Sequence, residues 1–370
     1  MTLTKQLMSD SKFFKNTPYQ DYSSYECDFM PAKLAKKMVV PFWDPTIDYM
    51  DNRKEYMTVI DSVLRQGDLI LRQDLEIFEI KFADKVGTKY AVGVASGTDA
   101  LILTMKALGI GEGDEVIVPS YTFRATIEAV HHVGATPVLA DLGEDWRPYR
   151  TKKTKAIIPA HIAGEVLFWT LEEFETDILM IEDSCQAITA KPLTGIAAAY
   201  SFYPAKILGC FGDGGAIATN DEALYEELLK MRNHYKGDWS KFGYNSRLDN
   251  VQAAVLNTKI DYLDKMLQRR LKIAQRYDEE LKGVVTPNKR EVYQDYIIEC
   301  FDEEERDQLQ RFLEIKGIGS MANGYPFPKA VPKKKKAFEY ESRSLRIPCN
   351  PDLTDEQVTY VIKRINEFYN

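Results

Sequence analysis

The stretch Ser201-Phe202-Tyr203-Pro204-Ala205-Lys206 decides how this sequence of 370 residues is interpreted. It places a lysine just after an apolar run and just before the glycine-rich stretch 209–215. A long amine beside a buried strand is costly to place unless the protein uses it. Upstream, a second apolar run, Ile178-Leu179-Met180-Ile181, ends in Glu182-Asp183. The sequence therefore indicates an amine and an acid at the ends of two buried strands.

An amine and an acid in these positions are typical of a site for pyridoxal phosphate (PLP). Such a site needs a lysine that forms a Schiff base and an acid that keeps the ring nitrogen protonated. Lys206 and Asp183 are the candidates for these two roles. Taken alone, Lys206 could be a surface lysine after a turn, and Asp183 could simply cap a helix. Their occurrence together favours the cofactor site.

The composition is that of a soluble globular protein, with 45% hydrophobic and 28% charged residues. The formal net charge of −8 gives no reason to expect general nucleic-acid binding. The five cysteines are odd in number and lack metal-ligand or redox spacing, which favours a reducing cytoplasm. We expect neither a signal peptide nor a membrane span, because no suitable apolar stretch occurs.

Short apolar runs recur from about residue 90, and most are continuous rather than alternating, as in a sheet covered on both faces. We predict seven strands at 90–96, 115–120, 136–141, 156–161, 178–183, 198–203 and 215–220. Helical patterns at 98–108 and 122–132 lie between some of them.

After residue 220 the pattern becomes mainly helical. We predict helices at 221–234, 248–282 (with possible breaks), 303–316 and 355–369, and strands at 296–301 and 344–347. We divide the chain into an N-terminal extension, a large domain and a smaller C-terminal α+β domain, covering residues 1–39, 40–255 and 256–370.

Further segments carry candidate cofactor contacts. Gly97 and Thr98 follow a strand and open a helix, where free N–H groups can hold a phosphate, although simple N-capping is as good an interpretation. Ser201 could add a phosphate donor, and Phe123 could stack on a flat ring, although an isolated buried aromatic is more often part of a core. We interpret the lysine run 333–336 as a solvated loop, and the four histidines form no metal motif.

Together these segments resemble the nucleotide-sugar aminotransferases of the DegT/DnrJ/EryC1/StrS family, within fold-type I of the PLP enzymes. The resemblance runs from about residue 40 to the C-terminus, in the order of the family. It implies the α/β class, with a mostly parallel seven-stranded sheet flanked by helices and a smaller C-terminal α+β domain. The segments that carry it are 96–101, 111–119, 181–187, 201–221, 243–254 and 351–356.

The resemblance also implies roles for single residues. Lys206 would be the Schiff-base lysine and proton shuttle, and Asp183 would pair with the pyridinium nitrogen. Gln186 would lie near the ring and its hydroxyl. Phe123 falls where the family stacks an aromatic side chain on the ring.

The phosphate and the substrate would be bound by another group of residues. Gly97, Thr98 and Ser201 would hold the phosphate. Asn245 would reach that phosphate from the other subunit, which would make a homodimer obligatory for activity. Tyr325 falls near the family's substrate-side loop in the small domain.

The sequence also departs from the family pattern. The stretches 141–156, 161–183 and 187–201 are shorter than usual, and residues 1–39 have no recognisable counterpart. Arg124 stands where a small or apolar residue is usual. These departures bear on the substrate rather than on the type of reaction.

The resemblance implies PLP-dependent transamination of a nucleoside-diphosphate-linked keto sugar, with L-glutamate as the amino donor, in a cytoplasmic homodimer. Amination of a non-nucleotide ring ketone is an alternative. A PLP-dependent sugar dehydratase is another, but such relatives carry histidine in place of the lysine at 206. A third is a PLP-fold regulator without catalysis. Neither a nucleic acid nor a membrane is expected as a partner.

Overall fold

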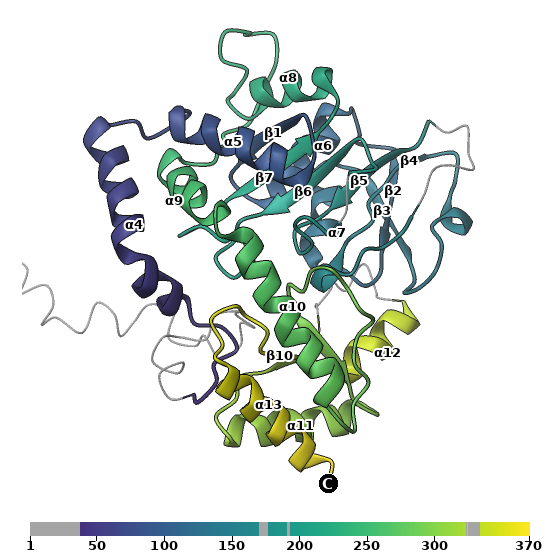
Figure 1. Cartoon of the computed structure of the whole chain (residues 1–370). Coiled ribbons are helices and arrows are strands. Elements are labelled where there is room, and N and C mark those ends of the chain that lie inside the picture. The colour runs from purple at the N-terminus through teal and green to yellow at the C-terminus, as the bar shows by residue number, and fades with distance from the viewer. Residues whose placement is uncertain (1–37, 170–176, 191–192, 323, 325–333) are drawn as a thin grey trace, which may run out of the picture.

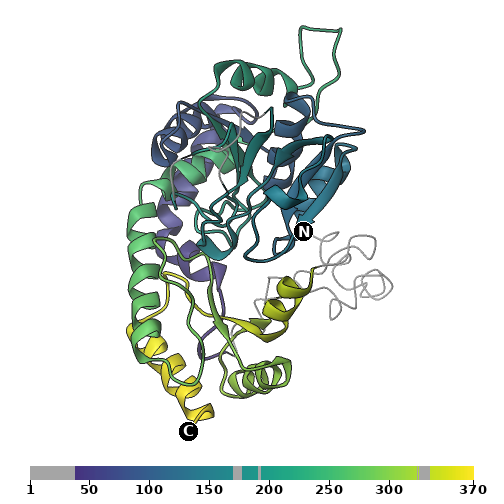
Figure 2. The ribbon, with the colours of Figure 1, turned by 90° about the vertical axis from the view of Figure 1, so that its right-hand side faces the viewer.

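The computed structural model describes residues 38–169, 177–190, 193–322, 324 and 334–370. The predicted extension, residues 1–39, lies almost entirely outside this part of the chain. The described residues form a large sheet with helices around it and a smaller sheet with its own helices below (Figure 1). Figure 2 shows one long helix, α10 (Leu263–Glu280), running along the side of the molecule between the two parts.

The large sheet contains all seven strands that the sequence predicts. Their spatial order is β1-β7-β6-β5-β4-β2-β3. The bounds are β1 Tyr90–Val94, β2 Glu115–Pro119, β3 Thr136–Ala140, β4 Thr154–Ile157, β5 Leu179–Asp183, β6 Ala197–Ser201 and β7 Gly215–Thr219.

Most neighbours in this sheet are parallel. The pairs β2–β3, β2–β4, β4–β5 and β5–β6 are parallel, whereas β7 is antiparallel to both β6 and β1. Strands β1, β5 and β6 therefore point the same way, and their carboxyl ends lie at one edge of the sheet. Because ligands of parallel α/β sheets bind outside the carboxyl ends of the strands, this edge is the expected place for a site.

Helices cover both faces of the sheet, which explains the continuous apolar runs. Val92 and Val94 pack on one face with α6 (Gly97–Ala107), α7 (Arg124–His132) and α8 (Glu222–Met231). Ala91 packs on the other with α5 (Gln73–Val86) and α9 (Asn250–Ile260). The α/β prediction with a mostly parallel sheet flanked by helices is confirmed.

The smaller part forms around a three-stranded antiparallel sheet in the order β8-β10-β9. A separate apolar cluster lies between this sheet and its helices. The elements are β8 Tyr296–Glu299, α11 Glu303–Ile315, β9 Met321–Ala322, α12 Lys335–Arg343, β10 Ser344–Ile347 and α13 Asp355–Phe368. The division at residues 255 and 256 stays a prediction; residue 255 lies inside α9.

Two segments differ from the sequence interpretation. No helix was predicted before residue 90, yet α4 (Pro45–Gln66) and α5 form there. Helix α4 buries only Tyr56 and Val63, so its apolar stripe is too sparse to stand out. The lysine run is not simply a solvated loop, because α12 begins at Lys335 and the Lys336 amine forms an ion pair with Glu144 at 2.7 Å.

Candidate active site

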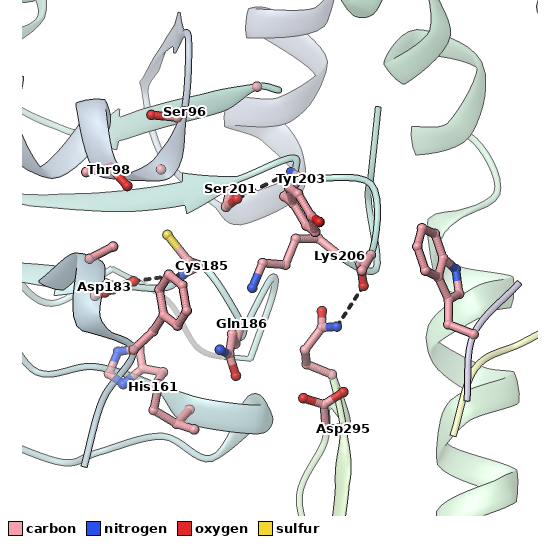
Figure 3. Close-up of a pocket in the computed structure, with 18 of the residues that line it drawn as sticks. Ser96, Thr98, His161, Asp183, Cys185, Gln186, Ser201, Tyr203, Lys206 and Asp295 are labelled. Carbon is pink, nitrogen blue, oxygen red and sulfur yellow. Dashed lines mark hydrogen bonds between the residues drawn. The ribbon is translucent and has the colours of Figure 1, made fainter. Parts of the chain in front are cut away.

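A cavity of about 360 Å³ opens at the carboxyl edge of the large sheet, and residues of the smaller part close its other side (Figure 3). Most of the side chains predicted to hold the cofactor line it. They are Gly97, Thr98, Phe123, Asp183, Gln186, Ser201 and Lys206. The fold thus brings together residues that lie more than a hundred positions apart in the sequence.

Asp183 ends strand β5 and is 7% exposed. One carboxylate oxygen accepts a hydrogen bond from the Thr126 hydroxyl at 2.7 Å, and the other accepts one from the Cys185 backbone N–H at 3.2 Å. Thr126 also forms a 2.7 Å hydrogen bond with the Thr122 hydroxyl. Both oxygens of the buried acid are therefore held in place by hydrogen bonds.

Lys206 lies in a tight loop that follows strand β6. The backbone N–H of Lys206 donates to the Tyr203 carbonyl at 2.8 Å. The loop folds back so closely that a Cβ atom at Gly209 would lie 2.4 Å from the Pro204 carbonyl oxygen. The amine extends into the cavity on the side of Cys185 and Gln186, and it has no hydrogen bond or ion pair with any described residue (Figure 3).

Gln186 is held by a turn after strand β4. Its side-chain oxygen accepts a hydrogen bond from the Ala163 backbone N–H at 2.9 Å. Ala163 has a φ of 56°, and Gly164 has a φ of 91° and lies so close to Val292 that a Cβ atom there would meet the Val292 carbonyl oxygen at 2.0 Å. This strained and crowded turn holds the Gln186 amide at the cavity wall through a hydrogen bond that its oxygen accepts.

The N-terminus of α6 provides donors at another part of the wall. The Ser96 side chain caps the helix by accepting from the Asp99 N–H at 3.0 Å. The N–H groups of Gly97 and Thr98, in the first turn, have no acceptor within the helix. A Cβ atom at Gly97 would lie 2.9 Å from the Ser201 Cβ, so glycine allows the helix start to approach β6. The arrangement suits an anion such as a phosphate.

Phe123 and Cys185 complete this part of the wall. Phe123 precedes α7, lines the cavity and is 43% exposed. Burial and the neighbouring Asp183 carboxylate raise the pKa of the Cys185 thiol well above its usual value. This thiol therefore stays protonated at neutral pH, which argues against a cysteine nucleophile.

The sequence analysis did not single out His161 as a site residue. It is buried at the cavity wall, with its Nε2 atom 3.4 Å from a Glu182 carboxylate oxygen. Its Nδ1 accepts from the Leu167 N–H at 3.1 Å. Glu182 also accepts hydrogen bonds from Thr194 and Gly195, each at 2.8 Å. A histidine at the end of a predicted strand is the signal that could have identified it.

The smaller part contributes charged side chains that the sequence analysis also missed. Arg346 of β10 forms an ion pair with Asp295 at 3.5 Å, and both line the cavity. The buried Arg270 donates to the backbone carbonyls of Gln294 and Cys349, each at 2.9 Å. Burial lowers the pKa of Arg270. These residues lie in unremarkable helical or strand patterns, so only the fold reveals them.

Two predicted residues lie elsewhere. Asn245 does not line the cavity of its own chain; it is exposed, at the base of the loop between α8 and α9. That loop projects from the body in both ribbon views (Figures 1 and 2). Tyr325 lies outside the described residues. The roles of both stay predictions.

These residues fit PLP. A lysine amine with no hydrogen-bond partner in the described part of the chain shares the cavity with an acid whose two oxygens are held by hydrogen bonds. A helix N-terminus with a nearby hydroxyl suits the phosphate. Within the described parts of the chain, no group of histidine, cysteine and acidic side chains could hold a metal ion, and no helix is long and apolar enough to cross a membrane.

The fold and site are those of a PLP-dependent aminotransferase. Residues 50–366 match the model of the DegT/DnrJ/EryC1/StrS aminotransferase family, and the chain belongs to this family. Solved structures that share the fold include PLP and pyridoxamine phosphate forms. The predicted family, fold class, enzyme class and cofactor are thus confirmed.

Two known proteins are each 36% identical to the chain. One is the "Pleiotropic regulatory protein" of Geobacillus stearothermophilus, and the alignment covers 90% of this chain and 99% of that protein. The other is the dTDP-3-amino-3,4,6-trideoxy-alpha-D-glucose transaminase of Streptomyces venezuelae, and the alignment covers 91% of this chain and 98% of that protein. The structure of S. venezuelae DesV in complex with a ketimine intermediate is 34% identical, with a TM-score of 0.82 over 89% of this chain and 98% of that one.

The Thr126 hydroxyl provides a test of the acid's environment. We expect Thr126→Val, which keeps the side-chain shape and removes the hydrogen bond to Asp183, to lower kcat/KM roughly tenfold, the effect of about 1.4 kcal/mol. Steady-state transamination kinetics measure this. The control is Thr258→Val on α9, whose hydroxyl bonds only the Ala254 carbonyl. Equal kinetics for the two variants would show that the hydroxyl contributes nothing.

Proposed function

We propose that this protein transfers the amino group of L-glutamate to a keto sugar linked to a nucleoside diphosphate, with PLP as cofactor. The observation that carries the proposal is the Lys206 amine, which enters the cavity on the side of Asp183 and has no hydrogen-bond partner among the described residues (Figure 3). The sugar substrate is supported by relatives named as sugar transaminases, among them the S. venezuelae protein.

In this proposal each site residue has one task. Lys206 attaches the cofactor, and its freed amine moves the proton from the donor's Cα. Bound PLP accepts the electron pair that this proton leaves behind. Asp183 keeps the ring nitrogen protonated, since its carboxylate is fixed by Thr126 and by the backbone of Cys185.

The remaining wall residues bind and orient. Gly97 and Thr98, at the N-terminus of α6, and Ser201, at the end of β6, hold the phosphate. Phe123 offers its exposed face to the ring, and Gln186 lies near the ring hydroxyl. Tyr325 is proposed for the substrate side, near the small domain.

The reaction then balances in two halves. Glutamate leaves its amino group on the enzyme and departs as 2-oxoglutarate, whose new carbonyl oxygen comes from water. The keto sugar takes up that amino group, and its carbonyl oxygen leaves as water. Lys206 moves a proton in each half, in opposite directions, which explains why one flexible amine serves both.

The alternatives predict different behaviour. Lys206 disfavours the dehydratase, because relatives with that activity carry histidine at the position. A relative named as a regulatory protein keeps the non-catalytic regulator in view. A cyclic ketone without a nucleotide would need the same Lys206 and Asp183, so only a substrate comparison separates it.

The function is tested on purified protein with PLP. We expect a visible absorption band that glutamate bleaches, followed by 2-oxoglutarate release when a panel of nucleotide-linked keto sugars is supplied. A matched panel of free cyclic ketones is the control for substrate class. A protein that stays colourless after PLP is added would support the alternative of a regulator without catalysis. Turnover of free cyclic ketones alone would rule out the nucleotide-sugar proposal.

We further propose that the active enzyme is a cytoplasmic homodimer with shared sites, in which Asn245 reaches the partner's phosphate. The projecting loop that carries Asn245 supports this, since its Trp239 and Phe242 side chains are 92% and 101% exposed. The cysteines of the described part form no disulfide, as expected in a reducing compartment.

Subunit mixing tests the shared site. Lys206→Ala and Asn245→Asp should each be inactive alone, the second because a carboxylate would repel the phosphate. Unfolding and refolding the two together should restore about a quarter of wild-type activity, because half of the dimers would carry one intact site. If Asn245 acts within its own chain, or not at all, mixing restores nothing beyond the sum of the two variants.

A further inference from the structure

We propose that Gln294 is a positioning residue for Lys206, and that it makes the position of the catalytic amine depend on the small domain. The proposal rests on the assignment of Lys206 as the lysine that attaches the cofactor. It concerns a residue just before β8, in the smaller part of the molecule.

The side-chain amide of Gln294 bonds the backbone on both sides of Lys206. Its Nε2 donates to the Ala205 carbonyl at 3.0 Å, and its Oε1 accepts from the Ile207 N–H at 3.1 Å. Figure 3 draws the first bond as a dashed line above Asp295. Gln294 itself is 7% exposed, so water competes little for these bonds. We call this pair of bonds the Gln294 clamp.

The clamp fixes the two peptide groups that flank Lys206. The Lys206 N–H is already bonded to the Tyr203 carbonyl within the loop. The carbonyl at residue 205 and the N–H at residue 207 are bonded by Gln294. With both flanking peptide groups fixed, the Cα atom of Lys206 is fixed as well, and the reach of its side chain starts from a defined point.

Gln294 is in turn anchored to its surroundings. Its carbonyl accepts a hydrogen bond from the buried Arg270 guanidinium at 2.9 Å. Its backbone N–H donates to the Ala163 carbonyl at 3.3 Å. Ala163 belongs to the turn whose N–H holds Gln186. One residue therefore connects the lysine loop, the glutamine at the cavity wall and an arginine of α10.

The geometry assigns Gln294 an indirect role. Both polar atoms of its side chain are bonded to backbone groups, so it acts on the reaction through Lys206. A misplacement of a reacting group by about 1 Å can lower a rate about a hundredfold. Loss of the clamp should therefore slow the proton transfer by Lys206 more than it weakens the binding of glutamate.

The test uses Gln294→Met, which keeps the length of the side chain and removes both hydrogen bonds. The matched control is Gln357→Met on α13. Gln357 also bonds two backbone groups, accepting from the Thr354 N–H at 3.0 Å and donating to the Val39 carbonyl at 3.2 Å. It does not line the cavity. The two variants thus lose the same kind of contact at different places.

Two readouts are taken on the PLP-loaded protein. In a single turnover with glutamate, Gln294→Met should bleach the visible band at least about tenfold more slowly at saturation, with the half-saturating glutamate concentration changed less than about threefold. In hydrogen exchange, the peptide that contains Ile207 should lose its amide protection at least about tenfold faster. Gln357→Met should match the wild type in both.

Wild-type bleaching and wild-type exchange in Gln294→Met would overturn the proposal, as would an equal effect of Gln357→Met. If Gln294→Met does not fold, Gln294→Glu replaces it: it keeps the acceptor for Ile207, turns an acceptor oxygen toward the Ala205 carbonyl, and should show both changes. A wild-type protein that shows no visible band with PLP would contradict the proposed function instead. The hydrogen-exchange measurement would still test the Gln294 clamp in that case.

Discussion

The parallel pairing of β5 with β6 is the constraint on which the site depends. It places Asp183, the last residue of one strand, and Ser201, the last residue of the other, at the same edge of the sheet. The loop after Ser201 then carries Lys206 over the end of β5. A one-residue shift in this register would turn each side chain to the opposite face and separate the acid from the amine.

The contacts around this pairing hold the two groups in different ways. Asp183 is fixed directly, through hydrogen bonds to Thr126 and the Cys185 backbone. The Lys206 amine has no such partner among the residues that the structure describes, and its position depends on the loop backbone and on the Gln294 clamp. The proposed roles, an acid that stays in place and an amine that moves between bonded and free states, need this difference.

The parts predictable from the sequence are those with local patterns. The seven strands can be recognised as apolar runs because both faces of the sheet are buried. The order of motifs such as 181–187 and 201–206 was enough to predict the fold and the cofactor. Helix α4 was missed because it buries two residues only. Gln294 and Arg270 were missed because their importance comes from contacts between distant segments, which no local pattern encodes. Tyr325 and most of residues 1–39 lie outside the described part, and the role of Asn245 depends on a second subunit.

The central claim is that Lys206 is the lysine that attaches PLP, and chemical trapping tests it most directly. The PLP-loaded protein is reduced with borohydride, digested, and its peptides are weighed by mass spectrometry. The account predicts that the reduced phosphopyridoxyl group is found on the peptide that contains Lys206, and on no peptide of Lys206→Ala. A label on another lysine, or none on the wild type, would contradict it.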